Sequence, residues 1–196
     1  MKEIVIATTN QGKLKEIKKI FADLPFKFHS LSDFPGFPEI IEDGNTFEEN
    51  AEIKARAVFD KTGEIAIGDD SGLVVEQLNG RPGIYSARYS GPGATYESNN
   101  IKLLQELENF PEPHFAKFVC AAVYFDGKEK IVKRGEVKGK IIKEPRGTNG
   151  FGYDPVFIPE GFKLTLAEIE TEEKNKFSHR AIAFREMKKL FEGRLK

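Results

Sequence analysis

Two adjacent aspartates, Asp69 and Asp70, interrupt the apolar run IAIGDDSGLVV at residues 65–75. Short apolar runs with β-branched residues are typical of buried strands. A buried carboxylate is unfavourable unless it is paired, hydrogen-bonded or bound to a metal. The local residues leave two interpretations open. Asp, Ser and Gly are turn formers and favour a turn, whereas acids at the end of a strand favour a metal site or a catalytic site.

A second segment, TTNQGK at residues 8–13, has the residue types of a phosphate-binding helix start. It follows a predicted strand, so that Thr8, Thr9 or Asn10 can cap the next helix and Lys13 lies in its first turn. The free N–H groups and the positive end of a helix attract anions. The alternative is an ordinary N-cap followed by a surface lysine. The Walker A pattern GxxxxGK[ST] is absent from the chain.

Glu42 and Asp43 stand just before another predicted helix. That helix is expected to begin at Thr46, because Thr46 and Glu49 fit a capping box. A solvated acidic turn is one interpretation. The other is a carboxylate supplied to Mg²⁺, which prefers one or two carboxylates, water and substrate phosphate oxygens.

The segment TNGFGYDP at residues 148–155 places Phe151 between two glycines. Glycines allow close approach of a ligand, and an exposed Phe could stack on a base, worth about 1–3 kcal/mol. The alternative is a tight turn with Phe151 and Tyr153 in the core.

His179 and Arg180 follow Ser178, the expected N-cap of the last helix. Cations are disfavoured at a helix N-terminus, so an anionic or carbonyl ligand would explain them. Two exposed cations tolerated in the first turn are the alternative.

The elements that would position these residues follow from hydrophobic periodicity and turn residues. We expect one domain over residues 1–196, large enough for two lobes. The predicted class is α/β or mixed α+β, with a partly antiparallel sheet that includes a hairpin at Asp126-Gly127. Strands are expected at 3–8, 115–125 and 129–142, and the apolar residues on both sides of the acids in 65–75 are strand-like. Helices are expected at 11–24, 46–63, 96–108 and from about residue 178 onward.

Composition excludes several classes of protein. The 30 basic and 31 acidic residues nearly cancel, which disfavours bulk nucleic-acid binding. No apolar run approaches the ~20 residues of a membrane span. The first residues, MKEIVIATTN, lack an h-region and a small-residue cleavage site, so a signal peptide is not expected. The single cysteine, Cys120, lies in the apolar run FVCAAVYF and is expected in the core. A cytoplasmic protein without a zinc site is the expectation.

Five segments together resemble the inosine triphosphate pyrophosphatase family, the dITP/XTP or non-standard purine NTP pyrophosphatases. They are TTNQGK, GDDSGL, PGIYSARYSG, GTNGFGYDPVF and SHRA, and the likeness runs from about residue 4 to residue 190. One departure is TTN in place of the commoner TGN or SGN. The resemblance implies an elongated mixed β-sheet flanked by helices, with two lobes around a central nucleotide cleft. It also implies a homodimer that uses Mg²⁺ to hydrolyse ITP, dITP and XTP to the monophosphate and pyrophosphate.

The resemblance also implies roles for single residues. Asp70 would be the proton acceptor, Glu42 and Asp70 would serve the metal, and Ser71 would contact substrate. The triphosphate would be held by Thr8, Thr9, Asn10, Gln11, Gly12 and Lys13. The base and sugar would be recognised by Phe151, Gly152, Tyr153, Asp154, Lys174, His179 and Arg180. Donors from His179 and Arg180 would pair with the 6-oxo group that hypoxanthine and xanthine share.

The role of Asp69 stays open between a second metal-side carboxylate and a structural acid. In an extended strand, neighbouring side chains alternate between faces, so Asp69 and Asp70 would point in opposite directions. Three other functions remain as alternatives: another Mg²⁺-dependent nucleotide or phosphate-ester hydrolase, a non-catalytic nucleotide-binding module, and an RNA-binding protein.

Overall fold

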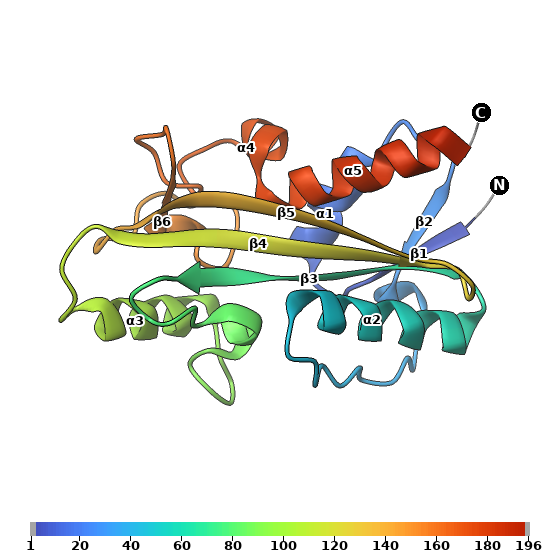
Figure 1. The fold of residues 1–196 in the computed structure, drawn as a ribbon, viewed down its shortest axis with the longest axis horizontal. Coiled ribbons are helices and arrows are strands. Elements are labelled where there is room, and N and C mark those ends of the chain that lie inside the picture. Colours follow the sequence, from blue (N-terminus) through green and yellow to red (C-terminus); the bar gives the residue numbers. More distant parts are fainter. Residues whose placement is uncertain (1–2, 195–196) are drawn as a thin grey trace. The chain divides into compact units, whose positions relative to one another are not determined.

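The computed structural model describes residues 3–194, and over these residues the chain forms a six-stranded mixed sheet with helices (Figure 1). The strand order is β2-β1-β3-β4-β5-β6. The strands are β1 (Glu3–Ala7), β2 (Lys27–Ser30), β3 (Ile65–Val75), β4 (His114–Phe125), β5 (Lys130–Ile141) and β6 (Phe157–Pro159). The helices are α1 (Gln11–Ile20), α2 (Phe47–Thr62), α3 (Tyr96–Leu107), α4 (Thr171–Phe177) and α5 (His179–Arg194). The predicted mixed α/β class is confirmed.

The chain divides into two compact units, each with its own apolar core. Unit 1 comprises the chain up to Asp70, residues Cys120–Gly135 and the chain from Arg180 onward. Unit 2 comprises Ser71–Val119 and Glu136–His179. Strands β3, β4 and β5 contribute residues to both units, and the division of β3 falls directly after Asp70. None of the described helices is long and apolar enough to cross a membrane.

In unit 1, β1 pairs in parallel with β2 on one side and with β3 on the other. Helices α1 and α5 lie on one face of these strands, and α2 lies on the other (Figure 1). Ile4, Ile6 and Ile67 point to the face of α1 and α5, where Phe21 and Phe184 are also buried. Because side chains alternate along a strand, Asp69 shares this face with Ile67, and Asp70 points toward α2.

Gly68 allows α2 to pack very close to β3. A Cβ at this position would lie 1.9 Å from the carbonyl oxygen of Ala51, which no side chain could tolerate. Helix α2 begins after Thr46, whose hydroxyl accepts the N–H of Glu49 at 3.1 Å, and it ends at Gly63 in the left-handed conformation. The glycine and the two caps together fix which turn of α2 faces Asp70.

In unit 2, β5 pairs antiparallel with β6. Leu73, Leu103, Phe118, Phe157 and Leu166 belong to its buried core. Helix α3 begins with a capping box, in which Thr95 accepts the N–H of Ser98 at 3.1 Å and Ser98 accepts the N–H of Thr95 at 2.9 Å. This cap sets the start of α3, next to the TNGFGYDP segment discussed below.

Most predicted elements are present, and the differences have local causes. The DDSG segment is not a turn, because it lies inside the eleven-residue strand β3. Helix α1 stops at Ile20 rather than residue 24, because Pro25 disfavours helical backbone at Leu24. The hairpin at Asp126-Gly127 connects β4 and β5 as predicted. The short elements β2, β6 and α4 were not predicted, and they are too short for a clear periodicity.

Candidate active site

Asp70 is buried on the α2 face of β3 and is held by side chains of one helix. Its side chain accepts hydrogen bonds from Lys54 Nζ at 3.0 Å and from Asn50 Nδ2 at 3.3 Å. Lys54 Nζ also donates to Glu42 at 2.8 Å, so both predicted metal-side acids meet at a single ammonium group. The structure therefore brings Glu42 and Asp70 together, as the resemblance implied.

Asn50 and Lys54 were missed by the sequence reasoning. They lie four residues apart and therefore share one face of α2, and both are buried, with residue exposures of 0% and 8%. Asn50 also accepts the backbone N–H of Gly44 at 2.9 Å, which ties the Glu42 segment to Asp70. The available signal was an Asn and a Lys placed inside the small-residue stripe of Ala51 and Ala55.

The ionisation of Asp70 is disfavoured by its surroundings. Burial raises the pKa of Asp70 above the ordinary value of an aspartic acid, although Lys54 and Lys13 oppose the effect. Burial acts on Lys54 in the direction that lowers its pKa, but Asp70 and Glu42 outweigh it and raise the pKa of Lys54. A carboxylate that has a raised pKa and lies beside a lysine that stays protonated is suited to accept a proton near neutral pH.

Asp69 lies on the opposite face of β3, in a network of charges of which only Lys13 is partly exposed. Its carboxylate forms ion pairs with Lys13 and with Arg180, whose Nε lies 3.3 Å away. The thiol of Cys120 donates to Asp69 at 3.1 Å. Arg180 Nη1 in turn donates to Glu16 on α1 at 2.6 Å. These contacts favour the structural acid of the two alternatives for Asp69, and Cys120 is a core residue as predicted.

The ionised form of Asp69 is strongly favoured. Burial alone would raise the pKa of Asp69, but Lys13 and Arg180 outweigh it and hold this pKa well below its ordinary value. Asp69 and Glu16 likewise raise the pKa of Arg180 despite its burial. Burial and the charge of Asp69 raise the pKa of the Cys120 thiol, which keeps it protonated. The charges of the network cancel, because two carboxylates, Asp69 and Glu16, pair with two cations, Lys13 and Arg180.

The helix start predicted to bind phosphate has the expected geometry. Asn10 is the N-cap of α1, and its side-chain oxygen accepts the N–H of Lys13 at 3.1 Å. Thr8 is buried and accepts the N–H of Asn10 at 3.1 Å, while Thr9 and Gln11 are exposed. The first turn of α1 carries no acidic residue, so the positive helix end stays available to an anion.

The donor set next to Asp70 fits a hard divalent cation. Glu42 and Asp70 already converge on one cationic group, and the Glu42 side chain is 29% exposed. No group of three or more His, Cys, Asp or Glu side chains with metal-binding geometry occurs within residues 3–194. Two carboxylates completed by water and phosphate oxygens are the pattern that Mg²⁺ adopts with nucleotides.

In unit 2, the FGYD segment is anchored by Asp154 and Lys174. Asp154 accepts the N–H of Phe151 at 2.9 Å and the ammonium of Lys174 at 2.6 Å. Lys174 Nζ also lies 5.1 Å from the centre of the Phe151 ring. Lys174 is buried, whereas Lys176 is exposed and pairs with Glu173. Lys174 is therefore the lysine that the structure brings to Phe151.

Three other predicted residues are buried against protein partners. The hydroxyl of Tyr153 donates to the carbonyl of Ser86 at 2.8 Å, within the PGIYSARYSG segment. The His179 ring stacks on Phe118 at 4.8 Å. Arg180 is 1% exposed and belongs to the Asp69 network of unit 1. The roles in base recognition predicted for these three residues stay predictions.

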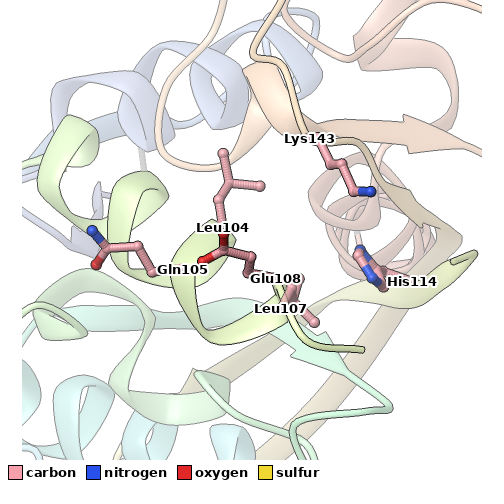
Figure 2. Close-up of a pocket in the computed structure, with 6 residues that line it drawn as sticks. All are labelled: Leu104, Gln105, Leu107, Glu108, His114 and Lys143. Atoms are coloured by element: carbon pink, nitrogen blue, oxygen red, sulfur yellow. The ribbon is translucent and has the colours of Figure 1, made fainter. Parts of the chain in front are cut away.

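A cavity of about 280 Å³ in unit 2 is lined by residues that the sequence did not place in a site (Figure 2). Its lining residues come from the second half of α3, the start of β4 and the segment after β5: Leu104, Gln105, Leu107, Glu108, His114 and Lys143. We assign it no part in the candidate site.

The chain matches one family of known proteins over nearly its whole length. The Ham1 family model matches residues 4–190, and the chain belongs to the Ham1 family. A Ham1 protein from Coxiella burnetii superposes with a TM-score of 0.91 at 39% identity, covering 98% of this chain and 100% of that one. The Ham1 protein of Staphylococcus aureus superposes with a TM-score of 0.88 at 41% identity, covering 98% of this chain and 100% of that one.

Relatives with assigned activities are also similar over nearly their full length. A Geobacter sulfurreducens protein named dITP/XTP pyrophosphatase is 52% identical over 185 residues, which are 93% of each chain. A Bacillus licheniformis protein of the same name is 48% identical over 194 residues, covering 98% of this chain and 99% of that one. The resemblance seen in the sequence motifs is confirmed.

Proposed function

We propose that this chain hydrolyses the non-standard purine nucleoside triphosphates ITP, dITP and XTP to the monophosphate and pyrophosphate. This would remove them from the nucleotide pool before they are incorporated into DNA or RNA. The observation that carries the proposal is the Asp70 site, where a buried carboxylate of raised pKa shares Lys54 with Glu42. The dITP/XTP pyrophosphatase activity in the names of the relatives agrees with it.

Glu42 and Asp70 are the residues that would hold Mg²⁺. When bound, the cation would neutralise part of the charge that develops on the leaving pyrophosphate. Lys54 keeps the two carboxylates in place and keeps a positive charge beside Asp70. These contacts pre-organise the acids, so little rearrangement is needed when the substrate arrives.

Thr8, Thr9, Asn10, Gln11, Gly12 and Lys13 would bind the triphosphate. Backbone N–H groups at the start of α1 point outward from the helix and suit phosphate oxygens. Lys13 adds a full positive charge, and its ion pair with Asp69 fixes where that charge lies. Asp69 and Arg180 thus act on the substrate through Lys13, and any direct contact of Arg180 with the base stays a prediction.

The chemical step is the attack of water on the α-phosphorus. The water oxygen forms a bond to this phosphorus, and the bond from the phosphorus to the oxygen bridging toward the β-phosphate breaks. Asp70 accepts the proton that the water loses, and the bridging oxygen leaves with pyrophosphate. A raised pKa makes Asp70 a stronger base than an ordinary aspartate, and general base catalysis typically contributes about 10²–10⁴-fold.

Unit 2 would supply recognition of the base and sugar. Phe151 is the residue that would stack on the base, and Gly152, Tyr153 and Asp154 keep its segment in position. Ser71, the residue after Asp70, would contact the substrate as well. His179 would donate to the 6-oxo group, which disfavours adenine because a 6-amino group presents a donor there.

Three further properties belong to the proposal. The two units would act as one pyrophosphatase domain over residues 1–196, the active protein would be a homodimer, and it would work in the cytoplasm. Size-exclusion chromatography with light scattering tests whether the protein is a homodimer. A mass of about twice the 22.1 kDa chain is expected, and a monomeric mass would contradict it.

The test is a nucleotide panel of ITP, dITP, XTP, GTP and ATP with Mg²⁺, in which pyrophosphate and orthophosphate are measured separately. We expect pyrophosphate release from the first three, at rates well above those for GTP and ATP. Asp70→Asn is the control and should release pyrophosphate about 10²–10⁴-fold more slowly. Release of orthophosphate would favour another type of nucleotide hydrolase, and binding without turnover would favour a nucleotide-binding module.

A further inference from the structure

The first turn of α3 contacts the segment that carries Phe151, although no sequence motif includes this turn. Tyr96 is the first residue of α3 and is 48% exposed. Its ring centre lies 6.1 Å from that of Phe151, with 38° between the ring planes. This is within the range of favourable aromatic pairs. A large exposed aromatic at this place is informative because it packs against the ring proposed to bind the base.

Asn100, one turn further along α3, ties the same segment to the helix. Its side-chain amide is buried and donates to two carbonyls at 2.9 Å, one of Tyr96 and one of Gly152. Gly152 directly follows Phe151, so this bond fixes the backbone next to the ring. The other side of the segment is held by Asp154, which accepts the N–H of Phe151 at 2.9 Å.

The segment needs this support because it is rich in glycine. Gly150 and Gly152 both have positive φ, at 74° and 66°, and free glycines lose more conformational entropy on ordering than other residues. A Cβ on Gly150 would also lie 2.0 Å from the Asp154 carboxylate. Glycine therefore permits the turn, and the contacts from α3 select one conformation of it.

We infer that Tyr96 and Asn100 are positioning residues that set the Phe151 ring for base stacking. The inference rests on the proposed function. Asn100 holds the backbone at Gly152, and Tyr96 packs against the ring, so that the ring is ordered before substrate binds. Pre-organisation of this kind improves affinity by reducing the entropy lost on binding. The affected quantity is recognition of the base and not of the triphosphate.

The test compares a substrate that has a base with an anion that has none. KM for ITP and the inhibition constant of inorganic tripolyphosphate are measured for the wild type, Tyr96→Leu, Tyr96→Phe and Asn100→Ala. We expect Tyr96→Leu and Asn100→Ala to raise KM for ITP by about five- to tenfold, a part of the effect of full base stacking. The inhibition constant of tripolyphosphate and kcat should stay within about twofold, and Tyr96→Phe should behave as wild type.

A double-mutant comparison identifies the route of the effect. In a Phe151→Leu background, Tyr96→Leu should change KM for ITP by less than about twofold, because residues that act through each other are not additive. Ile101→Ala is the matched control, since Ile101 is a 50% exposed residue of the same helix. It should leave both constants unchanged. Unfolding would reduce the concentration of active enzyme and would not raise KM alone.

Each negative result has a separate meaning. If the wild type releases pyrophosphate from ITP but Tyr96→Leu keeps the wild-type KM, the positioning role is wrong and the proposed function stands. An equal rise in the tripolyphosphate constant would also overturn it, because the effect would then not concern the base. If the wild type does not release pyrophosphate from ITP, the proposed function itself fails.

Discussion

The two faces of β3 at Asp69 and Asp70 differ sharply, although the two residues are adjacent and both are buried. On the face of α1 and α5, Asp69 meets two cations and a thiol. On the face of α2, Asp70 meets a cation that it shares with Glu42. The first neighbourhood favours ionisation of the carboxylate, and the second opposes it.

The difference shows how one strand can carry structure on one face and chemistry on the other. An acid whose pKa is held low stabilises the fold at neutral pH, and an acid whose pKa is raised destabilises it there. A buried acid that lowers stability at neutral pH is more easily explained by a role in activity than by a role in folding. We therefore propose that Asp69 contributes mainly to stability and that Asp70 contributes mainly to turnover.

The largest effect is expected from Asp70→Asn. An amide cannot accept the proton from water, so kcat for ITP should fall by about 10²–10⁴-fold. The free energy of unfolding should stay within about 1 kcal/mol of wild type or rise, because the variant no longer buries a charge that its surroundings disfavour. Pyrophosphate release and urea unfolding measure the two quantities. Turnover near the wild-type level would contradict the assignment.

Asp69→Asn should have the opposite effect on stability. Removing one partner of a buried ion pair leaves Arg180 and Lys13 poorly compensated, which typically reduces the free energy of unfolding by about 3–5 kcal/mol. Urea unfolding at neutral pH is the measurement, with Asp70→Asn as the matched isosteric control. Equal free energies of unfolding for the two variants would contradict the proposal that Asp69 stabilises the fold and Asp70 does not.

Lys54→Met should change the pH dependence of turnover. Lys54 lowers the pKa of Asp70, so its removal should raise that pKa further. Because Asp70 must be ionised to accept a proton, the acidic limb of kcat/KM against pH moves to higher pH. Lys61→Met, at an exposed lysine of the same helix, should leave the limb in place. A limb that moves to lower pH would contradict the proposed proton acceptor.

The smallest effect is expected at Cys120. Cys120→Ala removes the thiol hydrogen bond to Asp69 and should reduce the free energy of unfolding by about 1 kcal/mol. Cys120→Ser also makes the side chain smaller but keeps a hydrogen-bond donor. The difference in stability between the two variants therefore reports the hydrogen bond. Turnover of ITP should be unchanged in both variants. A large loss of kcat with normal stability would place Cys120 among the functional residues instead.

The sequence predicted the parts of the site that depend on local rules. The Thr46 cap, the hairpin at Asp126 and the burial of Cys120 follow from turn chemistry and apolar runs. For α1 the sequence offered three candidate caps, and the structure selects Asn10. Lys174 was named by the family resemblance, and it lies 5.1 Å from the centre of the Phe151 ring. Opposite orientations of Asp69 and Asp70 followed from strand alternation alone.

The charged partners could not be predicted from sequence. Lys54 and Glu16 belong to helices that carry several similar charges, and only the packing of α2 and α1 against β3 makes these two buried. The sequence also did not show why residue 68 is a glycine, because the reason is its close contact with Ala51 of α2. Tertiary contacts decide which of many charged side chains lose their water, and a single sequence does not record such contacts.

The most direct test is an NMR titration of the carboxyl carbons of Asp69 and Asp70 in the folded protein, with Asp69→Asn and Asp70→Asn used for assignment. The ordinary pKa of an aspartic acid is about 3.9. We expect Asp70 to titrate above this value and Asp69 to stay ionised well below it. Two midpoints near the ordinary value, or the reverse order, would contradict the division of roles between the two faces.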